Sequence, residues 1–337
     1  MRSVRKKEHI ENYLKTSFHG DTLLGDIFLE HNALPNMNFD DIDTSTAFLG
    51  KKISYPILIN AMTGGSALTQ EINRDLSMLA KEFNIPMAVG SQTIALDDNE
   101  DIIESFKIVR EIIGTEGIVI SNLSSQATVE QAKHALDQIQ GDAIQIHLNP
   151  AQELVMEEGD RDFKGAINNI EAIVKGVDKK VIVKEVGFGI SKDVAQRLYN
   201  VGIRNIDISG YGGTNFIEIE NLRNRACDFT ELYSWGIPTA ASLIKCRELP
   251  SDLNLISSGG IRSSMDIVKS IILGADLAGI SGELLAYLVH GGYANAKDYI
   301  ENLIYKIKIL MLLLGKQNIE ELKSTNYKVT GKLKELI

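Results

Sequence analysis

A single lysine lies in the middle of an apolar, β-branched segment. Lys184 is part of VIVKEVGFG, with valines on its N-terminal side and a valine two residues after it. A buried ammonium is costly unless it faces a negative partner. Three partners are possible: a carbonyl that forms a Schiff base, a carboxylate such as Glu185 or Asp207, or a flavin ring that is negative when reduced. A Lys–Asp pair would make the lysine purely structural.

Glycines follow the last two apolar segments of the chain. Residues 258–262 read SGGIR, and Ser281 precedes Gly282. Because glycine lets backbone N–H groups approach an anion closely, paired loops of this kind bind phosphate in parallel α/β barrels. The sequence therefore predicts a phosphate site, with tight turns as the alternative reason for the glycines. The run SGYGGT at 209–214 could complete this cradle or act as a hinge.

Residues 147–153, HLNPAQE, place an imidazole, two amides and a carboxylate in one short connection. Glu153 could bind Mg²⁺, which takes one or two carboxylates together with phosphate oxygens. It could equally compensate the dipole at the first turn of a helix. The sequence alone leaves both roles open.

Two further segments offer binding groups. AMTGG at 61–65 supplies unhindered backbone on which a planar ring could lie, with Thr63 able to hydrogen-bond its edge. RKKEH at 5–9 concentrates positive charge in an acidic protein. That run is either a frayed, solvated tail or a cluster that folds over a polyanion.

Alternation of apolar segments with amphipathic segments predicts the fold. Continuous apolarity is typical of parallel strands covered on both faces, and it occurs at 56–60, 86–90, 117–122, 143–148, 181–186, 205–210, 254–260 and 277–282. Helical patterns occur at 73–83, 101–113, 128–140, 163–174, 192–201 and 264–273. Eight such units indicate a (β/α)₈ TIM barrel, which gathers functional groups at the carboxyl ends of its strands. The polar residues at those ends are Asn60, Ser91, Asn122, His147, Lys184 and Ser209.

We expect one domain over 1–337, with no linker of low complexity. Its parts are an N-terminal extension at 1–55, the barrel at 56–290 and a C-terminal helical segment at 291–337. The stretch 214–235 is expected to be an irregular lid or binding loop. Residues 303–315 carry two lysines and fall short of the roughly twenty apolar residues that span a bilayer, so we expect a packed helix.

Charge and cysteine content exclude several classes of protein. The chain has 35 Lys plus Arg against 45 Asp plus Glu, a net charge of -10, which argues against nucleic acid or an anionic membrane as partner. Cys227 and Cys246 lack metal-ligand spacing, which predicts neither a disulfide nor structural zinc. The basic start lacks the apolar stretch of a signal peptide, so we expect a cytoplasmic protein.

Ten motifs, in register over nearly the whole chain, resemble the type 2 isopentenyl diphosphate isomerases, FMN-dependent (β/α)₈ enzymes. They are RKKEH at 5–9, NAMTGG at 60–65, VGSQ at 89–92, SNL at 121–123, QIHLNPAQE at 145–153, EGDRDF at 158–163, VKEVGFG at 183–189, DISGYGGTNF at 207–216, SWGIPTAASL at 234–243 and SGGIR at 258–262. Each motif alone is weak evidence, but ten in order are specific.

The resemblance assigns roles to individual residues. FMN is expected to contact Ala61, Met62, Thr63, Ser91, Asn122, Lys184, Ser209, Thr214, Gly259, Gly260, Ser281 and Gly282. The diphosphate substrate is expected to contact Arg5, Lys6, His9, His147, Asn149 and Gln152, with Glu153 holding Mg²⁺. The resemblance also implies that the N-terminal run binds ligand and that the extension at 1–55 caps the substrate. It further implies that NADPH reduces the flavin and that the chain forms a homotetramer or homooctamer.

The implied reaction is the interconversion of isopentenyl and dimethylallyl diphosphate, a 1,3-proton shift without net redox change. Ordinary side chains are poorly matched to protonating an unactivated alkene, so reduced FMN is the expected acid–base catalyst. Lys184 would stabilise the anionic ring, and Gln152 would orient substrate or relay a proton, with His147 as the third expected catalytic residue.

Two other functions remain as alternatives. An FMN-dependent 2-hydroxy-acid oxidase or dehydrogenase shares the barrel, but such enzymes resemble a pattern with a histidine base, SNHGG, where this chain has SGYGG. A flavin- or phosphate-binding redox sensor would bind without turnover. The dense polar rim at 147–153 argues against the sensor, because binding alone does not require it.

Overall fold

The computed structural model describes residues 2–18, 20–97, 99–223 and 227–337, with no side-chain description for 2–5 and 7. Eight parallel strands form a closed barrel in the order β4 to β11, with β11 pairing back to β4. Their bounds are β4 Ile57–Ile59, β5 Met87–Ala88, β6 Val119–Ser124, β7 Ala143–Leu148, β8 Lys180–Glu185, β9 Asn205–Asp207, β10 Asn254–Ser257 and β11 Leu277–Ile280. Each strand overlaps a predicted segment, so the predicted TIM barrel is confirmed.

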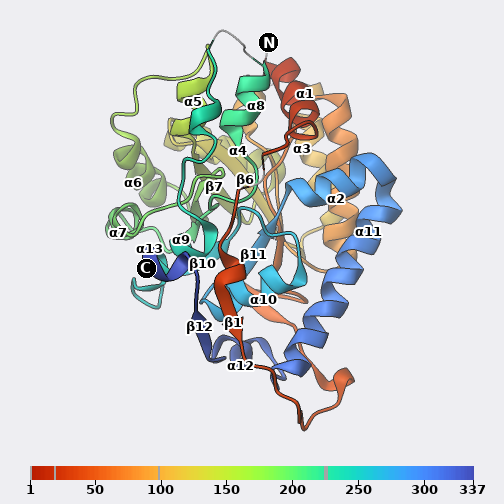
Figure 1. Ribbon diagram of the computed structural model, residues 1–337. Helices are drawn as coiled ribbons and strands as arrows, with labels where there is room; N and C mark the ends of the chain where they lie inside the picture. Colours follow the sequence, from red (N-terminus) through yellow and green to blue (C-terminus); the bar gives the residue numbers. More distant parts are fainter. Residues whose placement is uncertain (1, 19, 98, 224–226) are drawn as a thin grey trace.

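Helices surround the barrel on the outside (Figure 1). They are α2 Ala67–Glu82, α3 Glu100–Ile113, α4 Val129–Ile139, α6 Ala166–Gly176, α7 Lys192–Asn200, α9 Thr239–Arg247, α10 Ser264–Ile272 and α11 Gly282–Leu313. Side-chain hydrogen bonds fix where several of them begin: Ser66, Thr128 and Ser263 each form a capping box with the residue three positions later. The six predicted crossover helices are all present, with α2 beginning six residues earlier than expected.

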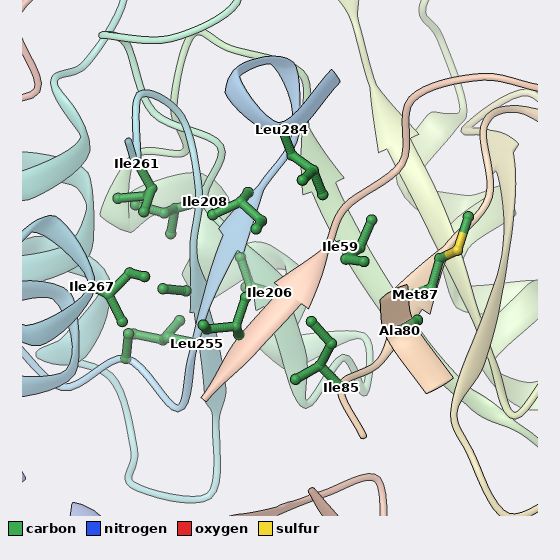
Figure 2. Packing of buried hydrophobic residues seen from close by; sticks show 14 of the residues in the cluster. Ile59, Ala80, Ile85, Met87, Ile206, Ile208, Leu255, Ile261, Ile267 and Leu284 are labelled. Carbon is green, nitrogen blue, oxygen red and sulfur yellow. The ribbon is translucent and has the colours of Figure 1, made fainter. Parts of the chain in front are cut away.

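Strand residues are buried on both faces of the barrel wall. Figure 2 shows Ile59 of β4 and Leu255 of β10 in the same apolar cluster as Ala80 of α2 and Ile267 of α10. Leu58, the residue next to Ile59, belongs to a separate cluster inside the barrel. This alternation explains why the strands read as uninterrupted apolar runs: both neighbouring side chains lie in a core.

The N-terminal extension reaches both ends of the barrel. Helix α1 Arg2–Tyr13 lies with α5 Pro150–Val155 and α8 Phe216–Arg223 at one end, whereas β1 Ile27–Leu29 pairs with β12 Tyr327–Val329 at the other (Figure 1). The hairpin β2 Thr46–Phe48 and β3 Lys51–Ile53 closes the amino-terminal end of the barrel, since Phe48 and Ile53 pack into the interior cluster. Thus only the first part of residues 1–55 can cap a substrate.

Two expectations about the periphery differ from the structure. The stretch 214–235 is not wholly irregular, because residues 216–223 form α8. The sequence hid this helix because the acidic residues Glu218 and Glu220 are buried along with Ile217 and Ile219, so no amphipathic pattern remains. The C-terminal segment is not wholly helical either: it contains α12 Ile319–Lys323 and α13 Leu333–Leu336, but also β12.

The expected packed helix at 303–315 is the last part of α11, which changes direction at Gly292, where φ is 72°. Within the described ranges, no helix combines the length and apolarity needed to cross a membrane.

Candidate active site

A cavity of about 540 Å³ opens at the carboxyl ends of the barrel strands. It is lined by every predicted site residue whose side chain is described: Lys6, His9, Ala61, Met62, Thr63, Ser91, Asn122, His147, Asn149, Gln152, Glu153, Lys184, Ser209, Thr214, Gly259, Gly260, Ser281 and Gly282. Arg5 lies in α1, but its side chain is outside the described part of the chain. Residues up to 276 positions apart in the sequence therefore meet in one place.

The basic N-terminal run folds over this cavity rather than fraying into solvent. Lys6 Nζ donates to the carbonyl of Ser91 at 2.7 Å and lies 5.1 Å from the centre of the Phe106 ring. His9 Nε2 is 2.7 Å from Glu220 Oε1 on α8. These contacts place the imidazole of His9 and the ammonium of Lys6 at the edge of the cavity.

Three charged residues of α8 hold α1 and the segment that follows it in this position. Arg223 pairs with Glu8 of α1 at 3.0 Å, with Glu158 at 2.7 Å and with Glu220 at 2.5 Å. Glu218 accepts the backbone N–H groups of residues 17 and 18 at 2.9 and 3.2 Å. Burial alone would raise the pKa of Glu220, but its bonds with His9 and Arg223 outweigh burial and lower it.

Sequence reasoning missed Glu218, Glu220 and Arg223. The available signal was the pair of acidic residues that alternate with isoleucines in FIEIENLR. A buried carboxylate demands hydrogen-bond donors or cations, so such a pattern predicts a partner. It does not predict which segment provides it.

Lys184 faces a carboxylate inside the barrel. Its ammonium lies 3.8 Å from Asp207 Oδ2 and donates to the backbone carbonyl of Glu185. Asp207 is fully buried, so this pair is shielded from solvent on the barrel side. Lys184 also lines the cavity, which leaves its charge within reach of a bound anion. Of the partners that the sequence offered for Lys184, the carboxylate of Asp207 is therefore present.

The neighbouring Glu185 shapes the loop after β8. One carboxylate oxygen accepts the backbone N–H groups of Val186, Gly187 and Phe188 at 2.6, 2.7 and 2.5 Å. Burial raises the pKa of Glu185 to about 7, against the lowering effect of these N–H groups and of Lys184. Val186 and Gly187 line the cavity, so the loop fixed by Glu185 forms part of its wall.

His147 is a neutral imidazole in this environment. Its pKa is lowered to about 3, mainly by burial and then by the charges of Lys184 and Lys6. A hydrogen bond with the carbonyl of Leu123 raises the pKa but does not offset these effects. Its Nδ1 lies 2.8 Å from Asn122 Oδ1. A polyanion bound in the cavity would oppose the two lysines and favour protonation of the ring.

The rim formed by α5 is tied together by hydrogen bonds. Asn149 Nδ2 donates to Gln152 Oε1 at 3.2 Å and to Glu153 Oε1 at 2.8 Å. Gln152 Nε2 donates to Glu220 Oε1 at 3.4 Å, which connects the rim to α8. Among the described residues, no group of three His, Cys, Asp or Glu side chains could hold a metal ion. Glu153 could therefore hold Mg²⁺ only together with ligands such as phosphate oxygens or water.

The glycine loops after β9 and β10 pack backbone against backbone. Gly259 and Gly260 have φ of 94° and 78°. A Cβ on Gly259 would lie 2.0 Å from the carbonyl oxygen of Gly210, and a Cβ on Gly260 would lie 2.4 Å from that of Gly212. A Cβ on Gly213 would lie 2.3 Å from the backbone nitrogen of Gly260. Only glycine fits these positions, which leaves backbone N–H groups at the cavity wall without covering side chains.

The ring side of the cavity fits a flavin. Thr63 Oγ1 is buried and finds no hydrogen-bond partner among the described residues. A buried hydroxyl without a partner is costly, so a ligand atom is expected to complete it. With Lys184 nearby to meet negative charge and glycine loops for a phosphate, the cavity has the groups that an FMN molecule needs.

The fold and the cavity define a class of flavin-dependent barrel. Residues 119–329 match the family of FMN-dependent dehydrogenases, to which the chain belongs. Among solved structures, flavocytochrome b2 with pyruvate bound has a TM-score of 0.71 at 18% identity, covering 97% of this chain and 84% of that one. Mandelate oxidase with a monooxide FMN adduct has a TM-score of 0.65 at 15% identity, covering 96% and 92%. At these identities the likeness shows the fold alone.

Relatives with much higher identity define the family more closely. The isopentenyl-diphosphate delta-isomerase of Bacillus pumilus is 46% identical, covering 98% of this chain and 92% of that protein. The enzyme of the same name from Listeria welshimeri is 42% identical, covering 99% and 94%. This chain belongs to the isopentenyl-diphosphate delta-isomerase family, and the resemblance seen in its motifs is confirmed.

Proposed function

We propose that this chain interconverts isopentenyl diphosphate and dimethylallyl diphosphate by a 1,3-proton shift, with reduced FMN and Mg²⁺, as a type 2 enzyme of its family. One observation carries the proposal: a single cavity combines a flavin-sized cradle with a basic helix and a polar rim suited to a diphosphate. An oxidase of 2-hydroxy acids would need the cradle and a histidine base, but it has no use for the lysine and histidine of α1.

FMN would be held by groups at opposite sides of the cavity. The glycine loops at 259–260 and 281–282 would bind its phosphate, together with Ser209 and Thr214. Ala61, Met62, Thr63, Ser91 and Asn122 would surround the ring, with Lys184 beside it. Reduced FMN, when bound, supplies exchangeable protons next to the substrate. Lys184 stabilises negative charge on the ring by opposite charge fixed in advance, since its own position is set by Asp207.

The diphosphate would bind where the positive charge of this acidic protein is concentrated. Arg5, Lys6 and His9 come from α1, and His147 and Asn149 come from the end of β7 and the rim. Glu153 would hold Mg²⁺ together with oxygens of the diphosphate, because this ion is usually bound by one or two carboxylates with phosphate oxygens. Neutralising the diphosphate at a basic site also explains how a chain of net charge -10 binds a polyanion.

Gln152 would act on the reacting end of the substrate. Its amide is held at both ends, by Asn149 at the oxygen and by Glu220 at the nitrogen. An amide does not titrate near neutral pH, so Gln152 orients the substrate or passes a proton along hydrogen bonds. It is not a general base.

Replacement of Gln152 tests this role. In Gln152→Ala, FMN should remain bound while isomerisation falls by about 10²–10⁴-fold, the usual contribution of a positioned proton-transfer group. Gln196→Ala on the exposed face of α7 is the matched control and should leave turnover unchanged. Equal loss of flavin and turnover in Gln152→Ala would indicate a folding defect, and unchanged turnover would contradict the assigned role.

We extend the proposal to the setting of the enzyme. NADPH reduces the flavin, the chain is a single domain with α1 as its substrate cap, and the active form is a cytoplasmic homotetramer or homooctamer. Both cysteines are free thiols, Cys227 exposed and Cys246 buried, which suits a reducing compartment. Light scattering coupled to size-exclusion chromatography measures the assembly, and a monomeric mass with full activity would contradict it.

A further inference from the structure

A continuous chain of hydrogen bonds crosses the barrel beneath the cavity. Asn60 Nδ2 donates to Asp207 Oδ2 at 2.6 Å, and Gln145 Nε2 donates to Asn60 Oδ1 at 3.0 Å. Asn122 Nδ2 donates to Gln145 Oε1 at 3.2 Å, and Asn122 Oδ1 lies 2.8 Å from His147 Nδ1. The carboxylate and the three amides are all buried. The chain therefore links β9 to β7 through the barrel interior.

The carboxylate at one end determines the direction of every bond. Because a carboxylate only accepts hydrogen bonds, Asn60 must present its amide nitrogen to Asp207, and its oxygen then faces Gln145. By the same reasoning, Gln145 must present its nitrogen to Asn60 and its oxygen to Asn122. Asn122 must then present its nitrogen to Gln145, so that Asn122 Oδ1 faces the imidazole. At this last step the acceptor is an oxygen, so the facing ring nitrogen of His147 must carry a proton.

Bonds outside the chain fix the same orientation independently. The backbone N–H of Ala61 donates to Asn60 Oδ1 at 2.9 Å, which requires an oxygen at that position. Asp207 Oδ1 accepts from the backbone N–H of Ser209 at 3.2 Å and from the hydroxyl of Ser258 at 2.5 Å. Turning any amide around would leave buried donors facing donors and acceptors facing acceptors.

We propose that Asp207 fixes the tautomer of His147 through these amides, and that Asn60, Gln145 and Asn122 are positioning residues for the diphosphate site. The proton of the neutral ring stays on Nδ1, and Nε2 is the nitrogen that gains or loses a proton when the ligand changes. This inference rests on the proposed function, because His147 has an anion to meet only if the cavity binds diphosphate.

The arrangement joins the two halves of the active site. Asp207 lies 3.8 Å from the ammonium of Lys184 through the same oxygen that accepts from Asn60. One carboxylate thus holds the lysine beside the flavin cradle and orients the histidine at the diphosphate end. His147 can take up a proton at Nε2 without any change in the barrel interior, since Nδ1–H donates to Asn122 in both charge states.

The tautomer can be read directly by ¹⁵N NMR of the FMN-loaded protein labelled at histidine, without substrate. His147→Gln identifies the resonances of His147 by their disappearance. In the wild type at neutral pH, Nδ1 should resonate in the range of protonated nitrogen and Nε2 in the range of unprotonated nitrogen. The opposite assignment would overturn the proposal.

Two substitutions of the central amide separate positioning from packing. Gln145→Met keeps the shape but removes both hydrogen-bonding atoms, so the two tautomers of His147 should become mixed. Gln145→Glu, with the introduced carboxyl protonated, can donate to Asn60 and accept from Asn122, so it should restore the single tautomer. A fixed Nδ1–H tautomer in Gln145→Met would show that the amide chain does not set it.

Kinetics give a second readout. For Gln145→Met, KM for the diphosphate should rise by about tenfold, roughly the contribution of one hydrogen bond, with a smaller change in kcat. Gln145→Glu should restore KM. If Gln145→Met does not fold, the infrared carbonyl band of the introduced carboxyl in Gln145→Glu decides: a protonated acid supports the polarity, and a carboxylate overturns it. Because the NMR readout needs no turnover, failure of the tautomer and failure of the isomerase function are distinguished.

Discussion

The lowered pKa of His147 makes a quantitative prediction about stability. The perturbation is His147→Gln, whose side-chain amide can still donate to Asn122 but does not titrate. In the wild type, the folded chain keeps the imidazole neutral, since burial and the charges of Lys184 and Lys6 lower its pKa to about 3. In the unfolded chain the same group titrates near 6.5.

The sign follows from which state binds the proton. Below pH 6.5 the unfolded chain takes up a proton at His147 and the folded chain does not, so stability is lost as pH falls from 6.5 towards 3. Between pH 7.5 and 5.0, this single group should lower the free energy of unfolding by about 2 kcal/mol, from about 1.36 kcal/mol per pH unit below 6.5. This change of about 2 kcal/mol requires only that the pKa of His147 in the folded chain lies well below 5.

The assay is urea unfolding at both pH values, with oxidised FMN and without diphosphate. The wild type should lose about 2 kcal/mol more than His147→Gln on going from pH 7.5 to 5.0. His290→Gln, at an exposed position of α11, is the control and should behave like the wild type. Equal pH dependence in the wild type and His147→Gln would refute the lowered pKa and the neutral imidazole with it.

Three further predictions concern the cap, the cradle and the metal. Arg223→Ala breaks three ion pairs, including the one that ties α8 to Glu8 of α1, so KM for the diphosphate should rise at least about tenfold with FMN affinity unchanged. A change confined to flavin binding would contradict this role. Gly259→Ala places a Cβ 2.0 Å from a carbonyl oxygen, so it should lower FMN affinity, measured by flavin titration, and thermal stability, measured by calorimetry. The control Gly25→Ala has open space around the new Cβ and should change neither quantity. Glu153→Gln should raise the Mg²⁺ concentration for half-maximal activity by roughly tenfold or more, and an unchanged Mg²⁺ requirement would exclude Glu153 as a ligand.

The barrel was predictable because parallel strands and their helices leave strong local signals. Each strand is buried on both faces, as Leu58 and Ile59 illustrate, so it reads as an apolar run. Once the strand ends are known, closure of the barrel brings their polar residues together, which is why His147 and Lys184 could be placed at one site from sequence. The basic residues of α1 could be assigned to the same site only through the family resemblance.

The parts that could not be predicted depend on contacts between distant segments. Nothing local indicates that Arg223 meets Glu8, or that the hairpin at 46–53 closes the amino-terminal end of the barrel. Helix α8 was missed because buried carboxylates such as Glu218 and Glu220 have their partners on α1 and at residues 17–18. The amide chain from Asp207 to His147 likewise exists only in three dimensions, since its members come from β6, β7, β9 and the end of β4.

An anaerobic turnover experiment tests the central claim most directly. Purified protein is mixed with isopentenyl diphosphate, FMN, Mg²⁺ and dithionite, and dimethylallyl diphosphate is followed together with the flavin spectrum. We predict product over many turnovers while the flavin stays reduced. Bound flavin without product, in a protein whose oxidised flavin is reduced by a 2-hydroxy acid, would contradict the isomerase assignment and leave only the barrel and its FMN site.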